Sequence, residues 1–169
     1  MRGASYFWGA HWLLRDSGSR ITVMPAPTSG MQVDQKFREF ILKQAWRPAY
    51  SRSTDLADSI MTAIVLAPFA QAATRFIDLG RLRVQECERV KALHTELSKC
   101  GAHVEEILDS LMIHPSALHG AEIETYGDHP SQCALACPGC VCLESACEIR
   151  RACGRLSRTT LPSSLNSAL

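Results

Sequence analysis

Two segments of the chain carry hydrophobic patterns strong enough to predict helices. Residues 55–73 are apolar on nearly every side when wound as a helix, so we expect a buried helix there. Asp55 and Asp58 stand at its N-terminal end, where free N–H groups and the helix dipole favour carboxylates. The pattern therefore predicts a core helix that begins with two acidic side chains.

A second helix is predicted over residues 86–101, where the apolar residues return on a single stripe. Val90, Leu93 and Leu97 form that stripe, so one side of the helix should face a core. Gly101 is the natural residue to follow the last turn, because glycine adopts the left-handed backbone that ends many helices.

Shorter stretches of β-branched or alternating residues predict strands around these helices, and residues 36–46 predict a short amphipathic helix that Pro48 stops. The predicted strands are residues 20–24, 74–79, 103–107, 110–114 and 120–126. From residue 55 onward the order is helix, strand, helix and three strands. Short connections between such elements are typical of an α+β layer, which is the fold class we expect.

Composition and charge exclude several classes of function. The 169 residues can form one domain with a core, and 46% hydrophobic residues are ordinary for a soluble protein. A net charge of +1 gives no electrostatic case for nucleic acid or an acidic membrane surface. No apolar run reaches the roughly 18 residues of a membrane-spanning helix. Isolated Cys87 and Cys100, with no secretory signal, favour a cytoplasmic protein.

The pattern breaks after His129. Residues 130–169 show no periodicity, yet they hold six of the eight cysteines. One interpretation is a small zinc-binding interaction module with thiolates from Cys137, Cys140 and Cys142. The spacing differs from the paired ligands of structural zinc sites, and no histidine follows, so the sequence favours this interpretation less.

Charged residues of three separated segments could converge on one site. Asp58 begins one helix, Glu86 and Arg89 begin another on one face, and Asp128 and His129 follow a predicted strand beside Gly127. Carboxylates, an arginine and a histidine at the ends of elements suit proton transfer beside an anionic ligand. Spacing alone also allows a simpler interpretation, in which these groups are helix caps and surface ion pairs.

The motifs that carry these residues resemble a known family. DLADSIMTA (Asp55–Ala63), RVQECER (Arg83–Arg89) and ETYGDH (Glu124–His129) are similar, in this order and spacing, to motifs of the EPSP synthase family of enolpyruvyl transferases. The family pattern is D-A-x-M-T, then R-V-K-E-S/T-D-R, then T-Y-G/N-D-H-R. The resemblance is firm over residues 55–129 and looser over residues 1–54.

The resemblance implies a fold, a reaction and its substrates. It implies part of an inside-out α/β domain built from βαβαββ units, in which a cleft between two domains holds phosphoenolpyruvate and shikimate-3-phosphate. The enolpyruvyl group passes to a sugar-like hydroxyl and phosphate leaves. The resemblance implies neither a metal nor an organic cofactor. A related alternative is the enolpyruvyl transferase that acts on a UDP-aminosugar, which the motifs favour less.

The resemblance also assigns roles to four positions. Asp58 matches the aspartate that binds the shikimate hydroxyls and serves as a base. Glu86 matches the acid placed for proton transfer at the methylene carbon. Arg89 matches the arginine that clamps the phosphoenolpyruvate carboxylate, a task that suits its planar fork. His129 matches the histidine that lines the phosphate side.

Departures from the family pattern surround the break. Gln85 replaces a lysine, Glu88 an aspartate and Pro130 an arginine, and the K-T-F-P segment is absent. The codons for residues 130–133 can be written so that one restored base gives Arg-Ile-Ala-Met, as in the family. Residues 148–160, read in the shifted frame, can give a K-T-F-P-N-Y segment. We therefore expect a single-base deletion after His129.

Two regions follow from these observations. Residues 1–129 are expected to form part of the C-terminal domain of an enolpyruvyl transferase, and residues 130–169 to be an out-of-frame, disordered tail. The N-terminal domain that completes the site is not represented, so we expect no turnover from this chain alone.

Overall fold

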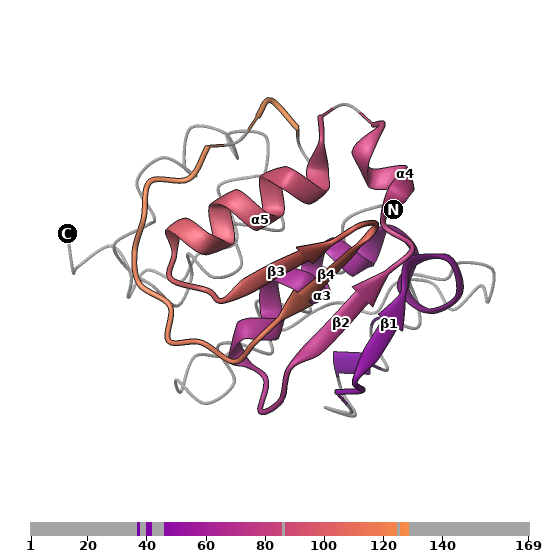
Figure 1. Ribbon diagram of the computed structural model, residues 1–169, viewed down its shortest axis with the longest axis horizontal. Coiled ribbons are helices and arrows are strands. Elements are labelled where there is room, and N and C mark those ends of the chain that lie inside the picture. Colours follow the sequence, from indigo (N-terminus) through magenta and orange to yellow (C-terminus); the bar gives the residue numbers. More distant parts are fainter. Residues whose placement is uncertain (1–36, 38–39, 42–45, 86, 125, 129–169) are drawn as a thin grey trace, which may run out of the picture.

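A computed structural model describes residues 37, 40–41, 46–85, 87–124 and 126–128 (Figure 1). In chain order the main elements are a strand, a helix, a strand, two helices and a final hairpin of two strands. They are β1 (Ala49–Ser51), α3 (Ile60–Leu66), β2 (Thr74–Ile77), α4 (Gly80–Arg83), α5 (Arg89–Lys99), β3 (Val104–Ile107) and β4 (Ser110–Ile113).

The four strands form one mixed sheet in the order β1-β2-β4-β3. β1 and β2 are parallel, as a connection through a helix requires, and the other neighbours are antiparallel. In the sheet register Tyr50 lies beside Phe76, Phe76 beside Leu111, and Val104 beside Ile113. All of these side chains are buried, so one face of the sheet packs against the core.

The opposite face of the sheet is open among the described residues. Arg75 and Glu105, which alternate with the buried positions along their strands, are exposed. This alternation of buried and exposed positions explains why β2 could be recognised in the sequence. The mixed α+β class expected from the pattern is confirmed.

Helix α3 is buried on every side, as its composition predicted, because all seven of its residues are buried. It is shorter than the expected helix over residues 55–73. Two features limit it: Ala57 has φ 48° and ψ −133°, which breaks the preceding turn, and Pro68 lacks the N–H that a continuing helix needs. Single turns flank α3 on both sides, at Arg52–Leu56, Ala57–Ser59 and Ala67–Phe69.

The N-terminal turn before α3 is capped by a serine, not by the expected aspartates. The Ser51 side chain accepts hydrogen bonds from the N–H groups of Ser53 and Thr54. Asp55 instead accepts from the Ser51 N–H at 2.8 Å and from Arg47 at 3.1 Å. The sequence identified the correct end of the helix but assigned its cap to the wrong side chain.

Helix α5 (Arg89–Lys99) confirms the second predicted helix, but it begins at Arg89, later than the predicted start at Glu86, and its C-terminal end agrees with the prediction. Val90, Leu93 and Leu97 are buried, and Gly101 takes the left-handed backbone with φ 88°. The Glu88 side chain caps the helix by accepting from the Lys91 N–H at 2.6 Å. A methyl group on Gly101 would lie 2.9 Å from the His119 ring, so close packing adds to the backbone reason for glycine.

The predicted strand at residues 120–126 is wrong. This segment turns around the C-terminal end of α5 and runs back beside the helix (Figure 1). Its polar groups bond to the helix: the His119 N–H donates to the Cys100 carbonyl, and the Glu124 N–H donates to the Glu96 carboxylate. A side-chain acceptor on α5 thus replaces the neighbouring strand that the pattern implied.

Several expectations concern the remaining chain. Phe37, Phe40 and Ile41 are helical and buried, in agreement with the short helix predicted over 36–46. The predicted strand at 20–24 and the tail at 130–169 lie outside the described residues. Strand β1 was not predicted, because three residues after Pro48 carry too little pattern. Within the described part, no helix has the length and apolar character to cross a membrane.

Candidate functional site

A buried ion pair joins two of the motifs found in the sequence. Arg89, the first residue of α5, donates from Nε to Asp128 Oδ2 at 2.9 Å and from Nη2 to Oδ1 at 2.7 Å. The Asp128 side chain is 0% exposed and that of Arg89 is 7% exposed. Two parallel bonds between a planar guanidinium and a carboxylate fix their relative orientation. Segments 39 residues apart in the chain are therefore fastened together here.

Local backbone geometry places both partners. Tyr126 and Gly127 have positive φ angles of 52° and 65°, and this sharp turn carries Asp128 inward. Gln85 lies four residues before Arg89 and accepts a further hydrogen bond from its Nη1. The amide that replaces the family's lysine thus supports Arg89 and adds no positive charge.

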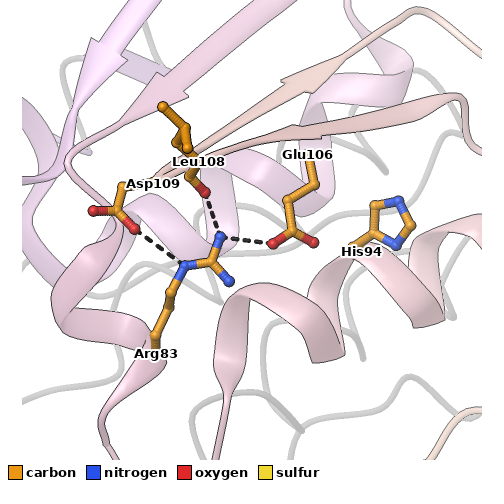
Figure 2. A pocket seen from close by; sticks show the side chains of 5 residues that line it. All are labelled: Arg83, His94, Glu106, Leu108 and Asp109. Atoms are coloured by element: carbon orange, nitrogen blue, oxygen red, sulfur yellow. Dashed lines mark hydrogen bonds and ion pairs between the residues drawn. The ribbon is translucent and has the colours of Figure 1, made fainter.

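Arg83, at the start of the same motif, is bound by acidic side chains and a backbone carbonyl of the protein itself. Figure 2 shows its guanidinium between Asp109 and Glu106, with bonds of 3.2 and 2.7 Å and a third bond to the Leu108 carbonyl. Glu88 accepts a further bond at 3.0 Å. Burial lowers the pKa of Arg83, but Glu106, Glu88 and Asp109 outweigh that effect and the pKa is raised.

These contacts tie the motif to the β3–β4 hairpin. Arg83, His94, Glu106, Leu108 and Asp109 line a shallow pocket (Figure 2). Because three acidic groups already neutralise Arg83, this pocket has little attraction for an anion. Arg83 therefore positions the motif that leads to Arg89.

Asp58 lies in the turn that leads into α3, close to its predicted place. Its carboxylate pairs with Arg52 Nη2 at 2.6 Å, and the Asp58 side chain is 57% exposed. The Arg52 Nε atom is buried without a partner among the described residues. Asp58 is therefore accessible to a ligand and held by a cation from the same loop.

A cluster of hydroxyl groups at the ends of β1 and β2 was missed in the sequence. Ser51 and Ser53 both donate to Asp78 Oδ2, the Ser53 bond measuring 2.9 Å. These two bonds, Ser51 first, hold the pKa of Asp78 below its ordinary value. The ends of parallel strands are common ligand sites. The available signal was therefore Ser51 and Ser53 at the end of one strand and Asp78 directly after the next strand. Such a cluster suits a polyhydroxylated ligand.

The structural role of Glu96, which flanks the apolar stripe of the helix predicted over residues 86–101, was also missed in the sequence. Its carboxylate is fully buried and accepts from Lys99 at 2.8 Å, from the Glu124 N–H at 3.0 Å and from the Tyr126 hydroxyl at 2.9 Å. Burial, followed by this bond to Glu96, raises the pKa of Tyr126 to about 12. Glu96 thereby holds the turn that delivers Asp128.

The structure brings together some of the predicted site residues. Arg89 meets Asp128, the neighbour of His129, and Gln85, the neighbour of Glu86. Glu86 and His129 themselves lie outside the described residues. No hydrogen bond or ion pair links Asp58 to Arg89 in the described ranges. The Asp58 group therefore lies before α3, and the Arg89 group lies separately at the start of α5.

Comparison with known proteins identifies the family. The model of the family described as EPSP synthase (3-phosphoshikimate 1-carboxyvinyltransferase) matches residues 16–160. A 3-phosphoshikimate 1-carboxyvinyltransferase of Rhizobium etli is 36% identical over 143 residues, covering 80% of this chain and 33% of the relative. The chloroplastic protein of that name from Brassica napus is 33% identical over 162 residues, covering 81% and 31%.

A third relative of the same name, from Nostoc punctiforme, is 40% identical over 85 residues, which cover 50% of this chain and 20% of the relative. The chain thus spans a third or less of the length of these relatives. The match to the family model covers most of the chain and includes all three motifs. The chain belongs to the EPSP synthase family of transferases.

Proposed function

We propose that this chain supplies one part of the active site of a 3-phosphoshikimate 1-carboxyvinyltransferase, which transfers the enolpyruvyl group of phosphoenolpyruvate to shikimate-3-phosphate. The observation that carries the proposal is the buried pair of Arg89 and Asp128, which fastens the RVQECER motif to the ETYGDH motif. Because two motifs of one family contact each other here, a shared site explains their charges better than separate surface ion pairs do.

The proposed reaction needs an anion clamp and three proton transfers: from the hydroxyl, to the methylene carbon and from the resulting methyl carbon. The shikimate hydroxyl adds to the enol carbon as a proton reaches the methylene carbon, which gives a tetrahedral intermediate. A proton then leaves the methyl carbon, and the bond to the phosphate oxygen breaks. Asp58 is proposed as the base for the hydroxyl, and Glu86 as the group that exchanges the proton at carbon.

Arg89 and His129 are proposed to bind the anionic groups. Because Asp128 and Gln85 already orient the guanidinium, a contact between Arg89 and a substrate carboxylate would need little further ordering of the side chain. The hydroxyl cluster of Ser51, Ser53 and Asp78 is proposed to contact the shikimate ring, as its donors and acceptors suit hydroxyl groups.

The first test transplants the segment into a complete enzyme. Residues 47–129 would replace the corresponding segment of the Rhizobium etli relative, and phosphate release would be measured with both substrates. We expect an active chimera that loses at least about 100-fold of its rate on Asp58→Asn or Glu86→Gln. The exposed Glu122→Gln variant is the matched control and should retain full activity. A folded but inactive chimera would contradict the proposal.

The second test concerns the chain as it stands. We propose that it does not turn over alone, because the chain covers a third or less of the relatives and a shared cleft needs residues from the remainder. Phosphate release from the purified chain should equal the blank, and a rate clearly above it would overturn this part.

The proposal includes a change of reading frame after His129. In the restored frame the gene would encode an arginine after His129 and, later, a K-T-F-P segment, which supply cations for phosphoenolpyruvate. Sequencing the gene across the codons for residues 129–132 tests this. Codons that cannot be shifted to Arg-Ile-Ala-Met would refute it.

A further inference from the structure

Two histidines and a glutamate gather on the hairpin of β3 and β4, away from the proposed active site. His103 and His114 immediately flank the paired residues Val104 and Ile113, and the His114 N–H donates to the His103 carbonyl at 3.0 Å. Because side chains alternate along strands, both rings project away from the buried side of that pair. Glu105 is two residues from His103 and so shares its face.

The three side chains present their ligand atoms to a common point. Glu105 Oε1 lies 2.9 Å from His114 Nε2 and 3.5 Å from His103 Nε2. One nitrogen or oxygen from each residue lies within 4.8 Å of the others. Donors on a tetrahedral zinc ion, each about 2.0–2.1 Å from the metal, are roughly 3.4 Å apart, so small side-chain rotations suffice.

The two imidazole rings are neighbours, and their planes would turn apart for both nitrogens to face one ion. They stack with centroids 4.2 Å apart and an interplanar angle of 16°. Their backbone is also fixed, because Ser116 Oγ accepts from the His103 N–H at 3.0 Å and donates to the His114 carbonyl at 2.8 Å. Preorganised ligands on paired strands lose little freedom when an ion binds.

The chemistry of the ligands selects the ion. Two imidazoles and one carboxylate are the protein ligands of many zinc sites that keep a fourth position for water. Hard cations such as magnesium prefer oxygen ligands alone, so they fit this set poorly. The side chains are 65%, 47% and 32% exposed for His103, Glu105 and His114, which leaves the open position accessible to solvent.

We propose that His103, Glu105 and His114 form a surface site for a zinc ion. The site belongs to the hairpin and does not depend on the proposed transferase activity. Among the described residues this is the one group of three or more potential ligands within reach of a single ion. An ion held there would join β3 to β4 through three side-chain bonds.

The experiment titrates the purified full chain with Zn²⁺ after its accessible thiols have been alkylated, because the cysteines of residues 130–169 could bind zinc themselves. Calorimetry should show one equivalent of Zn²⁺. The double variant His103→Gln/His114→Gln should weaken binding at least about tenfold, since loss of direct ligands exceeds the usual effect of outer partners. Matched controls are His94→Gln on α5 and Glu106→Gln, which follows Glu105 on β3 and points to the other face; both variants should bind Zn²⁺ normally.

A second measurement keeps the test valid if a variant is destabilised. Added Zn²⁺ should shift the imidazole proton resonances of His103 and His114 in the unsubstituted chain and leave those of His94 in place. It should also raise Tm of that chain but not of the double variant. Absence of binding, equal affinity in the double variant, or resonance shifts confined to other residues would each overturn the proposal.

Discussion

At the scale of single residues, the site depends on a buried ion pair and several unusual backbone angles. The sequence placed Arg89 and Asp128 among charged groups that could converge, but not their direct pairing, because that depends on how the segment after β4 returns along α5. The positions of Arg89 and Asp58 were foreseeable through motifs, yet the partner of each, Asp128 and Arg52, emerged only in three dimensions.

Removal of one member of the buried pair should be costly. Arg89→Ala removes both guanidinium bonds to the buried Asp128 carboxylate, and we expect a loss of about 3–5 kcal/mol in the free energy of unfolding. Arg89→Lys should lose less, because it keeps the charge but lacks the fork. Urea unfolding measures both. Asp109→Ala, which breaks an exposed pair, is the control and should cost about 0–1 kcal/mol.

Ala57 lies just before the proposed base in a backbone conformation that suits glycine. Its φ of 48° with ψ −133° is costly for an alanine, so Ala57→Gly should raise the free energy of unfolding by about 1 kcal/mol. Ala92→Gly in α5 should have the opposite sign and lose about 1 kcal/mol. Thermal unfolding of both variants decides; equal losses would show that the conformation at Ala57 carries no strain.

The raised pKa of Tyr126 predicts that the free energy of unfolding falls at alkaline pH. Its pKa is raised to about 12 from 10.0, so the folded chain resists ionisation that the unfolded chain accepts. The contribution of the neutral Tyr126 hydroxyl to the free energy of unfolding is therefore complete below pH 10 and disappears as the pH rises toward 12. A difference titration of phenolate absorption between the chain and Tyr126→Phe should show a transition near pH 12. A transition near pH 10 would contradict the assignment.

At the scale of elements, periodicity located most of the secondary structure. α5 and β2 were recovered because their apolar residues repeat with the period of the element, and the β3–β4 hairpin because Asp109-Ser110 divides two short stretches. β1 is too short for that signal, and residues 120–126 alternate like a strand while lying against a helix. Local pattern does not show which partner satisfies a backbone N–H, and here the partner is Glu96.

Glu96 should therefore control the order of the segment that ends at Asp128. In Glu96→Gln one oxygen becomes an NH₂ group, which would face the donors Lys99 and Glu124, and we expect a loss of about 1–3 kcal/mol. Hydrogen exchange at the Glu124 amide should accelerate, and the pKa of Tyr126 should fall toward its ordinary value. Ser98→Ala, an exposed change on the same helix, should alter neither measurement.

At the scale of the whole molecule, the described residues form one sheet with helices packed on its buried face. The apolar residues of α3 could be assigned to the core from composition, because a helix without a polar side has no face for water. The motifs identified the family, since three in register are specific although each is weak alone. The motifs also led us to expect only part of the family's length, and the chain spans a third or less of its relatives.

The position of β3 at the outer edge of the described sheet has a consequence for association between molecules. The unpaired backbone groups of an edge strand attract strands of other chains. Here two adjacent acidic side chains, Glu105 and Glu106, occupy the middle of that edge. A second copy aligned along β3 would bring like charges together, so this edge resists aggregation at the cost of a less apolar strand.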